Sequence, residues 1–121
     1  MESILIVDDD INLCEVLKEE LTEVGYDAFA VNDGNSVFSF LRNNKADLIL
    51  LDLKMPGKDG FQVLKELKDN KFNIKVIVLT AYADVKSAID SAKMGASDFI
   101  SKPYDFDELL ITIRKVLQRD G

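Results

Sequence analysis

The chain alternates short apolar runs with longer segments in which apolar residues recur every three or four positions. The uninterrupted apolar runs cover residues 4–7, 28–31, 48–51, 76–79 and 99–100. Apolar runs without polar alternation are typical of strands that are covered on both faces, as in a parallel sheet. We therefore predict five short buried strands.

The segments that follow these runs have the spacing of amphipathic helices. Leu13, Leu17 and Leu21 form one apolar stripe, and Gly25 follows it as a stop signal. Similar spacing predicts four further helices, around residues 37–41, 61–67, 85–92 and 106–117. Five strand–helix units in a row predict an α/β fold, with a parallel sheet and right-handed crossovers that place helices on both faces.

Composition is consistent with one compact unit. The chain has 121 residues, of which 47% are hydrophobic, and it shows neither a linker nor a low-complexity segment. We expect a single domain over residues 1–121. No apolar run approaches the length of a membrane span, and no signal peptide is evident, so we expect a cytoplasmic protein without a membrane partner.

The net charge, the single cysteine and the absence of histidine limit which kinds of functional site this chain can form. The chain carries 15 basic and 22 acidic residues, a net charge of −7, and it lacks a basic cluster, which argues against direct nucleic-acid binding. One cysteine and no histidine exclude an internal disulfide, paired-cysteine zinc sites and histidine-dependent nucleophiles. The side chains that remain available for a functional site are carboxylates, lysines and hydroxyl groups.

Such groups recur where the predicted strands end. Asp8 and Asp9 follow the first strand, Asp52 follows the third, Thr80 ends the fourth and Lys102 follows the fifth. Ligands of an open parallel sheet bind beyond the carboxyl ends of its strands. An isolated acidic group is more often a helix cap in a solvated loop, but a second acid at another strand end favours a cation site. Oxygen ligands alone suit Mg²⁺.

The other strand-end residues also have simpler interpretations. The stretch 52–60 contains Pro-Gly and Asp-Gly pairs that mark ordinary turns. Thr80 taken alone is a plain strand-end residue, and Lys102 taken alone is a solvated lysine. Because all of these residues lie at one edge of the sheet, a functional site is favoured over the simpler interpretations. The Lys102 ammonium would reach Asp52 or a bound phosphoryl group there.

Taken in order, these motifs resemble a known family. The paired acids, the DxxMPxxDG stretch that begins at Asp52, the pair Thr80–Ala81 and the pair Lys102–Pro103 look like the receiver domain of bacterial two-component response regulators. The similarity covers essentially the whole chain. The resemblance implies a flavodoxin-like, three-layer (βα)5 sandwich whose five parallel strands lie in the order 2-1-3-4-5.

Two local segments refine the resemblance. Residues 80–82 and 102–108 look most like receivers of NtrC-type transcription activators and the single-domain regulator of the sporulation phosphorelay. The resemblance implies that a histidine kinase or phosphotransferase domain supplies the phosphoryl group. The chain would catalyse only its own phosphorylation and dephosphorylation, and it has no histidine of its own to act as donor.

The resemblance also assigns roles within the acidic site. It implies that Asp52 is the phosphoacceptor. Asp8 and Asp9, with Asp52 and the backbone carbonyl of Lys54, would hold Mg²⁺, for which Mn²⁺ is a substitute. Lys54 and Tyr82 would tune the hydrolysis of the phosphorylated form.

Switching roles follow from the same resemblance. Thr80 matches the hydroxyl that turns toward the phosphoryl group, Ala81 the small residue beside it, and Lys102 the lysine that pairs with phosphoryl oxygens. The Lys102–Pro103 bond would be cis. Phe99 matches the switch aromatic, although many members have tyrosine there.

Partner surfaces are implied at two places. Leu13, Val16, Pro103 and Tyr104 match positions that dock the kinase in similar receivers, although Leu13 has an equal claim to the core. The surface of the fourth helix, fifth strand and fifth helix would change on phosphorylation and control an effector domain or a homodimer.

Two other classes of protein are alternatives to a receiver domain. An Mg²⁺-dependent aspartyl-phosphate phosphatase also uses an aspartate after a parallel strand, but it keeps an acid two residues later, where this chain has Lys54. A flavin carrier of the same strand order needs a Ser/Thr/Gly-rich phosphate loop after the first strand, and that loop is acidic here.

Overall fold

A parallel five-stranded sheet forms the centre of the computed structural model, which describes residues 1–119. Its strands lie in the order β2-β1-β3-β4-β5. The strands are β1 (Ser3–Val7), β2 (Asp27–Val31), β3 (Leu48–Leu51), β4 (Lys75–Thr80) and β5 (Asp98–Ser101). The predicted fold class and strand order are confirmed.

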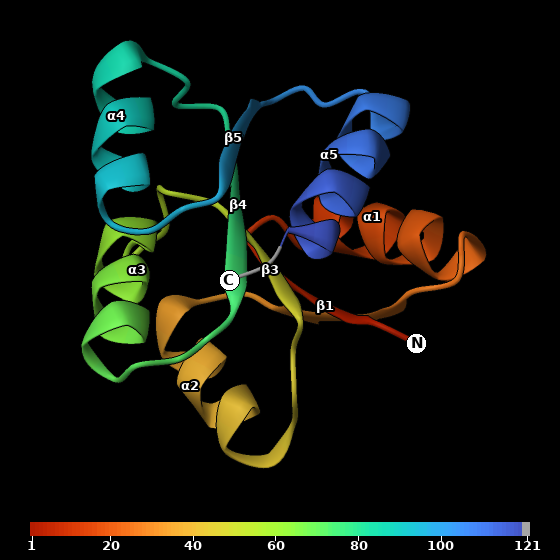
Figure 1. The fold of residues 1–121 in the computed structure, drawn as a ribbon, viewed down its shortest axis with the longest axis horizontal. Helices are drawn as coiled ribbons and strands as arrows, with labels where there is room; N and C mark the ends of the chain where they lie inside the picture. The colour runs from red at the N-terminus through yellow and green to blue at the C-terminus, as the bar shows by residue number, and fades with distance from the viewer. Residues whose placement is uncertain (120–121) are drawn as a thin grey trace.

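Helices cover both faces of this sheet (Figure 1). They are α1 (Ile11–Glu23), α2 (Gly34–Asn43), α3 (Gly60–Asp69), α4 (Val85–Lys93) and α5 (Phe106–Gln118). Helices α1 and α5 lie on one face, and α2, α3 and α4 lie on the other. The fold is therefore the expected three-layer sandwich.

An aspartate caps the first turn of every helix. The caps are Asp10, Asp33, Asp59, Asp84 and Asp105, and each side chain accepts a hydrogen bond from a backbone N–H of the first turn. A carboxylate at this place satisfies an unpaired donor and complements the positive end of the helix dipole. Part of the acidic composition therefore serves to start helices at the carboxyl edge of the sheet.

Strand β1 explains why the apolar runs lack alternation. Its residues Ile4 and Ile6 pack into the core layer beneath α1 and α5, whereas Leu5 and Val7 pack into the layer beneath α2 and α3. All four side chains are at most 1% exposed. A strand buried on both faces needs apolar residues at consecutive positions.

Strand register brings the acidic residues to one edge. Val7 of β1 pairs with Leu51 of β3, so Asp8 and Asp52 follow neighbouring strands at the same level. Strand β4 lies on the other side of β3 and ends at Thr80. Asp8, Asp52 and Thr80 thus lie at the ends of the three central strands of the sheet.

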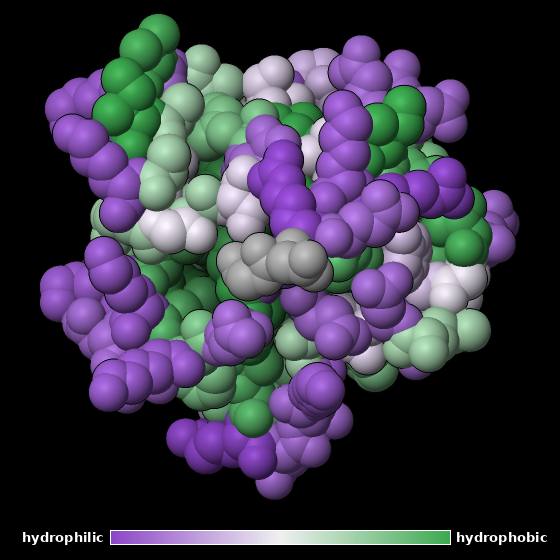
Figure 2. Space-filling view, in the orientation of Figure 1, coloured by the Kyte–Doolittle hydropathy of each residue, from purple (hydrophilic) through white to green (hydrophobic). Residues whose placement is uncertain are grey.

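Polar side chains cover most of the face seen in Figure 2, and an apolar group stands out over α4. This helix exposes Val85 and Ile89, which are 76% and 49% accessible.

Among the described residues, no helix has both the length and the apolar character that a membrane crossing requires.

Candidate functional site

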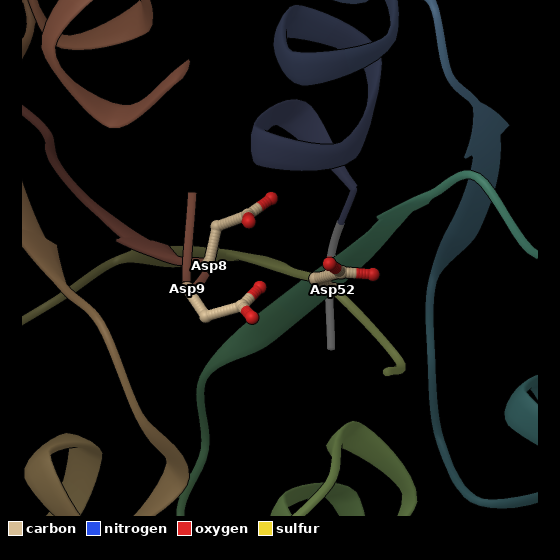
Figure 3. Close-up of side chains that lie close together, drawn as sticks. All are labelled: Asp8, Asp9 and Asp52. Carbon is tan, nitrogen blue, oxygen red and sulfur yellow. The ribbon is translucent and has the colours of Figure 1, made fainter. Parts of the chain in front are cut away.

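Three carboxylates meet at the carboxyl edge of the sheet. Asp8 and Asp9 extend from the end of β1 toward Asp52, which follows β3 (Figure 3). One oxygen of each carboxylate lies within 4.8 Å of the others. Asp8 and Asp52 are only 2% and 7% exposed. Three hard oxygen donors in such a group fit a divalent cation such as Mg²⁺.

The Lys102 ammonium joins this acidic group from the end of β5. Its Nζ atom lies 2.6 Å from Asp8 Oδ2 and 3.4 Å from Asp52 Oδ2. The side chain is 16% exposed, which is low for a lysine. The following bond to Pro103 is cis, as the resemblance implies. The structure therefore brings together four residues that the sequence placed at three strand ends.

Burial and charge act in opposite directions on this ion pair. Burial raises the pKa of Asp8, and the hydrogen bonds from Lys102 and from the Asp10 amide offset this effect only in part. Burial alone would lower the pKa of Lys102, but its hydrogen bond to Asp8 and the charges of Asp8 and Asp52 outweigh burial and raise it. The charged form of Lys102 is thus stabilised by its acidic neighbours. For Asp8, burial still disfavours the charged form more than the hydrogen bonds favour it.

Backbone N–H groups orient the two buried carboxylates. The Asp10 amide donates to Asp8 Oδ1 at 2.9 Å, and the Lys54 amide donates to Asp52 Oδ1 at 3.3 Å. Asp10 in turn caps α1 by accepting from the Leu13 amide. Asp10 is therefore the cap of α1, and Asp9 lies with the carboxylate group.

Thr80 and Phe99 lie on the strands beyond β3. Thr80 is fully buried, and its Oγ1 atom accepts a hydrogen bond from the Tyr82 amide at 3.2 Å. Phe99 is half-buried and packs against the core layer beneath α2 and α3. The two residues lie on paired strands, because Phe99 of β5 pairs with Val78 of β4 and Thr80 pairs with Ser101.

A shallow cleft of about 400 Å³ opens beside the acidic group. Its walls are formed by Leu13, Ala81, Lys102, Pro103 and Tyr104. Leu13 also packs against the core layer beneath α1 and α5, so the core interpretation is confirmed, and its role in docking stays a prediction. The cleft combines apolar walls with access to the Lys102 ammonium.

Two contacts around the site were not predicted. Lys54 Nζ lies 4.6 Å from the ring centroid of Tyr82, a cation–π contact between two loops. The Tyr104 hydroxyl donates to Glu20 Oε1 at 2.6 Å, and burial together with this hydrogen bond raises the Tyr104 pKa well above its usual range. Neither contact has a sequence signal, because each joins residues of unrelated segments.

A family model of the response regulator receiver domain matches residues 4–114. The chain belongs to this family. The receiver domain is 37% identical over 116 residues to sporulation initiation phosphotransferase F of Bacillus subtilis (strain 168), covering 96% of this chain and 94% of that protein.

It is also 40% identical over 114 residues to the transcriptional regulatory protein ZraR of Escherichia coli (strain K12). That match covers 94% of this receiver domain but only 26% of ZraR. The chain therefore spans about a quarter of the length of this relative.

Solved structures agree with the family. The receiver domain of the Francisella response regulator 1452 superimposes with a TM-score of 0.92 at 31% identity and covers 98% of both chains. The response regulator TrrA of Thermotoga maritima, solved in complex with Mg²⁺-BeF, superimposes with a TM-score of 0.85 at 37% identity, over 96% of this chain and 99% of that one. The resemblance found in the sequence is confirmed.

Proposed function

We propose that this receiver domain accepts a phosphoryl group on Asp52 and acts as a switch in two-component signalling. The geometry of Asp52 supports this function. Its buried carboxylate lies beside the oxygens of Asp8 and Asp9 and 3.4 Å from Lys102 Nζ. Phosphoryl transfer needs such a nucleophile together with positive charge that offsets the transferred oxygens.

The donor in this proposal is a phosphohistidine of a histidine kinase or phosphotransferase domain. A carboxylate oxygen of Asp52 bonds to phosphorus while the phosphorus–nitrogen bond breaks, and its electron pair returns to the imidazole nitrogen. Water later attacks phosphorus, which releases inorganic phosphate and restores the carboxylate.

Asp8, Asp9 and Asp52, with the Lys54 carbonyl, would hold Mg²⁺, which supplies charge stabilisation to the phosphoryl oxygens. The Lys102 ammonium exchanges part of its contact with Asp8 for a contact with those oxygens. The Mg²⁺-BeF complex of TrrA supports a metal role in this family.

The signal then passes through the strands beside Asp52. In the proposed switch, Thr80 turns its hydroxyl toward the phosphoryl group and Phe99 moves with it. The two residues lie on β4 and β5, which pair directly. The surface of α4, β5 and α5 changes as a result and controls an effector domain or a second copy of the chain.

The cleft beside Lys102 suits the incoming partner. Its apolar walls include Leu13, Pro103 and Tyr104, and Val16 of α1 is 55% exposed nearby on the same helix as Leu13. We assign kinase docking to these four residues. The 121 residues act in this proposal as a single cytoplasmic receiver domain that catalyses only its own phosphorylation and dephosphorylation.

A phosphatase-like function is not favoured. Phosphatases of the aspartyl-phosphate class place an acid two residues after the nucleophile, and this chain has Lys54 there. The Lys54 side chain instead extends over the ring of Tyr82.

Intact mass tests the phosphoacceptor directly. The chain is incubated with a small phosphodonor such as acetyl phosphate and Mg²⁺, and we expect one phosphoryl adduct. Asp52→Asn should abolish it. Asp47→Asn is the matched control, because Asp47 precedes the same strand and bonds to the Ser3 amide at the opposite edge. An adduct that persists in Asp52→Asn would contradict the assignment.

Asp9→Ala tests the metal role separately. Asp9 is exposed, so its removal should leave the fold intact while weakening Mg²⁺ binding measured by calorimetry. An unchanged dissociation constant would remove Asp9 from the ligand set.

A further inference from the structure

The Asp8 carbonyl oxygen is held by two donors from separate elements. Asn32, directly after β2, donates to it from Nδ2 at 3.0 Å, and the buried Cys14 of α1 donates from Sγ at 3.5 Å. Asn32 Nδ2 also donates to Cys14 Sγ at 3.6 Å. The Asp8 amide donates to the Val31 carbonyl at 3.2 Å, so both backbone polar groups of Asp8 are fixed.

This carbonyl belongs to the same rigid peptide plane as the Asp9 amide. Rotating that plane would change the direction in which the Asp9 side chain leaves the backbone. The Asp8 carboxylate is separately fixed by the Asp10 amide and by Lys102. Among the described residues, no side-chain hydrogen bond holds the Asp9 carboxylate, so its position depends on the backbone.

We propose that Asn32 is a positioning residue of the cation site, which fixes the Asp8–Asp9 peptide so that the Asp9 carboxylate stays beside those of Asp8 and Asp52. The inference rests on the proposed function, because it concerns the affinity of the same site for Mg²⁺. It assigns a role to β2, an edge strand that contributes no ligand.

The chemistry of this position requires an N–H donor. An asparagine amide has two N–H groups, whereas a leucine of similar size has none. A thiol is a weak donor, so Cys14 alone is a poor replacement. Asn32 is exposed, and water competes for the same carbonyl, which limits the effect to a moderate one.

The test compares two asparagines that make the same kind of bond. Asn44 is also exposed and donates from Nδ2 to the Phe40 carbonyl at 3.1 Å, at the end of α2. We expect Asn32→Leu to raise the Mg²⁺ dissociation constant of the full chain by about three- to tenfold, as measured by calorimetry. Asn44→Leu should leave it unchanged.

Backbone resonances show whether the peptide itself responds. In the metal-free protein, Asn32→Leu should shift the amide resonance of Asp9, because that amide shares the peptide whose carbonyl loses its donor. Asn44→Leu should shift Leu41 instead, which follows Phe40. Unmoved Asp9 resonances in Asn32→Leu would overturn the proposal.

Urea unfolding separates positioning from stability. If Asn32→Leu lowers the free energy of unfolding but leaves Mg²⁺ affinity unchanged, Asn32 is merely structural and the proposal is wrong. If the unmodified chain neither binds Mg²⁺ nor accepts a phosphoryl group, the proposed function fails instead. The two failures are therefore distinguishable.

Discussion

Helices α1 and α4 both begin at the carboxyl edge of the sheet, but they are anchored very differently. Helix α1 buries Cys14, Leu17 and Leu21 in the core. Within the nine residues of α4, Ser91 is the one buried side chain, and Val85 and Ile89 remain exposed. Because buried apolar area is the main source of helix stability in a protein, α4 is much more weakly held.

The strands beside the two helices show the same contrast. All residues of β3 are buried, and β1 is buried from Ile4 to Val7, whereas no residue of β5 is. The carboxylates therefore stand on a fully buried part of the molecule, while Thr80 and Phe99 adjoin a less buried part, for which we expect local opening to cost less free energy. The proposed switch would combine a fixed site with a neighbouring region that changes conformation.

Truncating one apolar residue on each helix should give the largest difference. Leu17 is fully buried, so Leu17→Ala should lower the free energy of unfolding by about 2–5 kcal/mol. Ile89 is 49% exposed, so Ile89→Ala should cost about 0.5 kcal/mol or less. Urea unfolding measures both, and similar losses in the two variants would show that α4 is anchored as firmly as α1.

Hydrogen exchange should resolve the same contrast without mutation. Amides of α1 are expected to exchange only through global unfolding, whereas those of α4 exchange through local opening, at rates at least about tenfold higher. The exchange rates are measured by NMR. Helix α5 is the internal control, because it buries Leu109, Ile113 and Val116 and should be protected as α1 is. Equal protection of the amides in α4 and α5 would contradict the claim that α4 is weakly anchored.

The sequence predicts most of this framework because burial on both faces leaves a simple pattern. All five strands were found from apolar runs, including β5, for which Phe99 and Ile100 were the only signal. Helix boundaries were less accurate. The apolar stripe of α1 begins at Leu13, but the helix begins at Ile11, because Ile11 and Asn12 are exposed and the cap at Asp10 sets the start.

The acidic site was equally accessible from the sequence. Parallel strands bring their carboxyl ends to one edge of the sheet, and the family resemblance implied the strand order that makes β1 and β3 neighbours, so Asp8 and Asp52 were expected to lie together. Contacts such as Asn32 with the Asp8 carbonyl, or Tyr104 with Glu20, were not predicted. They depend on side-chain conformations and on the distance between elements, which hydrophobic periodicity does not encode.

The smallest expected difference concerns the caps of α4 and α2. Asp84 accepts from the Ser87 amide at 2.6 Å, and this hydrogen bond lowers the pKa of Asp84. Asp33 caps α2 through the Ser36 amide, which lowers its pKa in the same way. A lowered pKa means that each cap contributes its stability above the ordinary aspartate pKa, and loses it as the pH falls through the lower folded value.

Acidification should therefore expose how much each helix depends on its cap. Below about pH 4, amides of α4 should exchange faster relative to those of α2, because α4 buries little apolar area to compensate for a protonated cap. Asp84→Asn should remove this pH dependence, since an asparagine caps a helix without titrating. NMR titration of both carboxyl groups provides the check, and an Asp84 pKa at or above the ordinary value would contradict the cap as the cause.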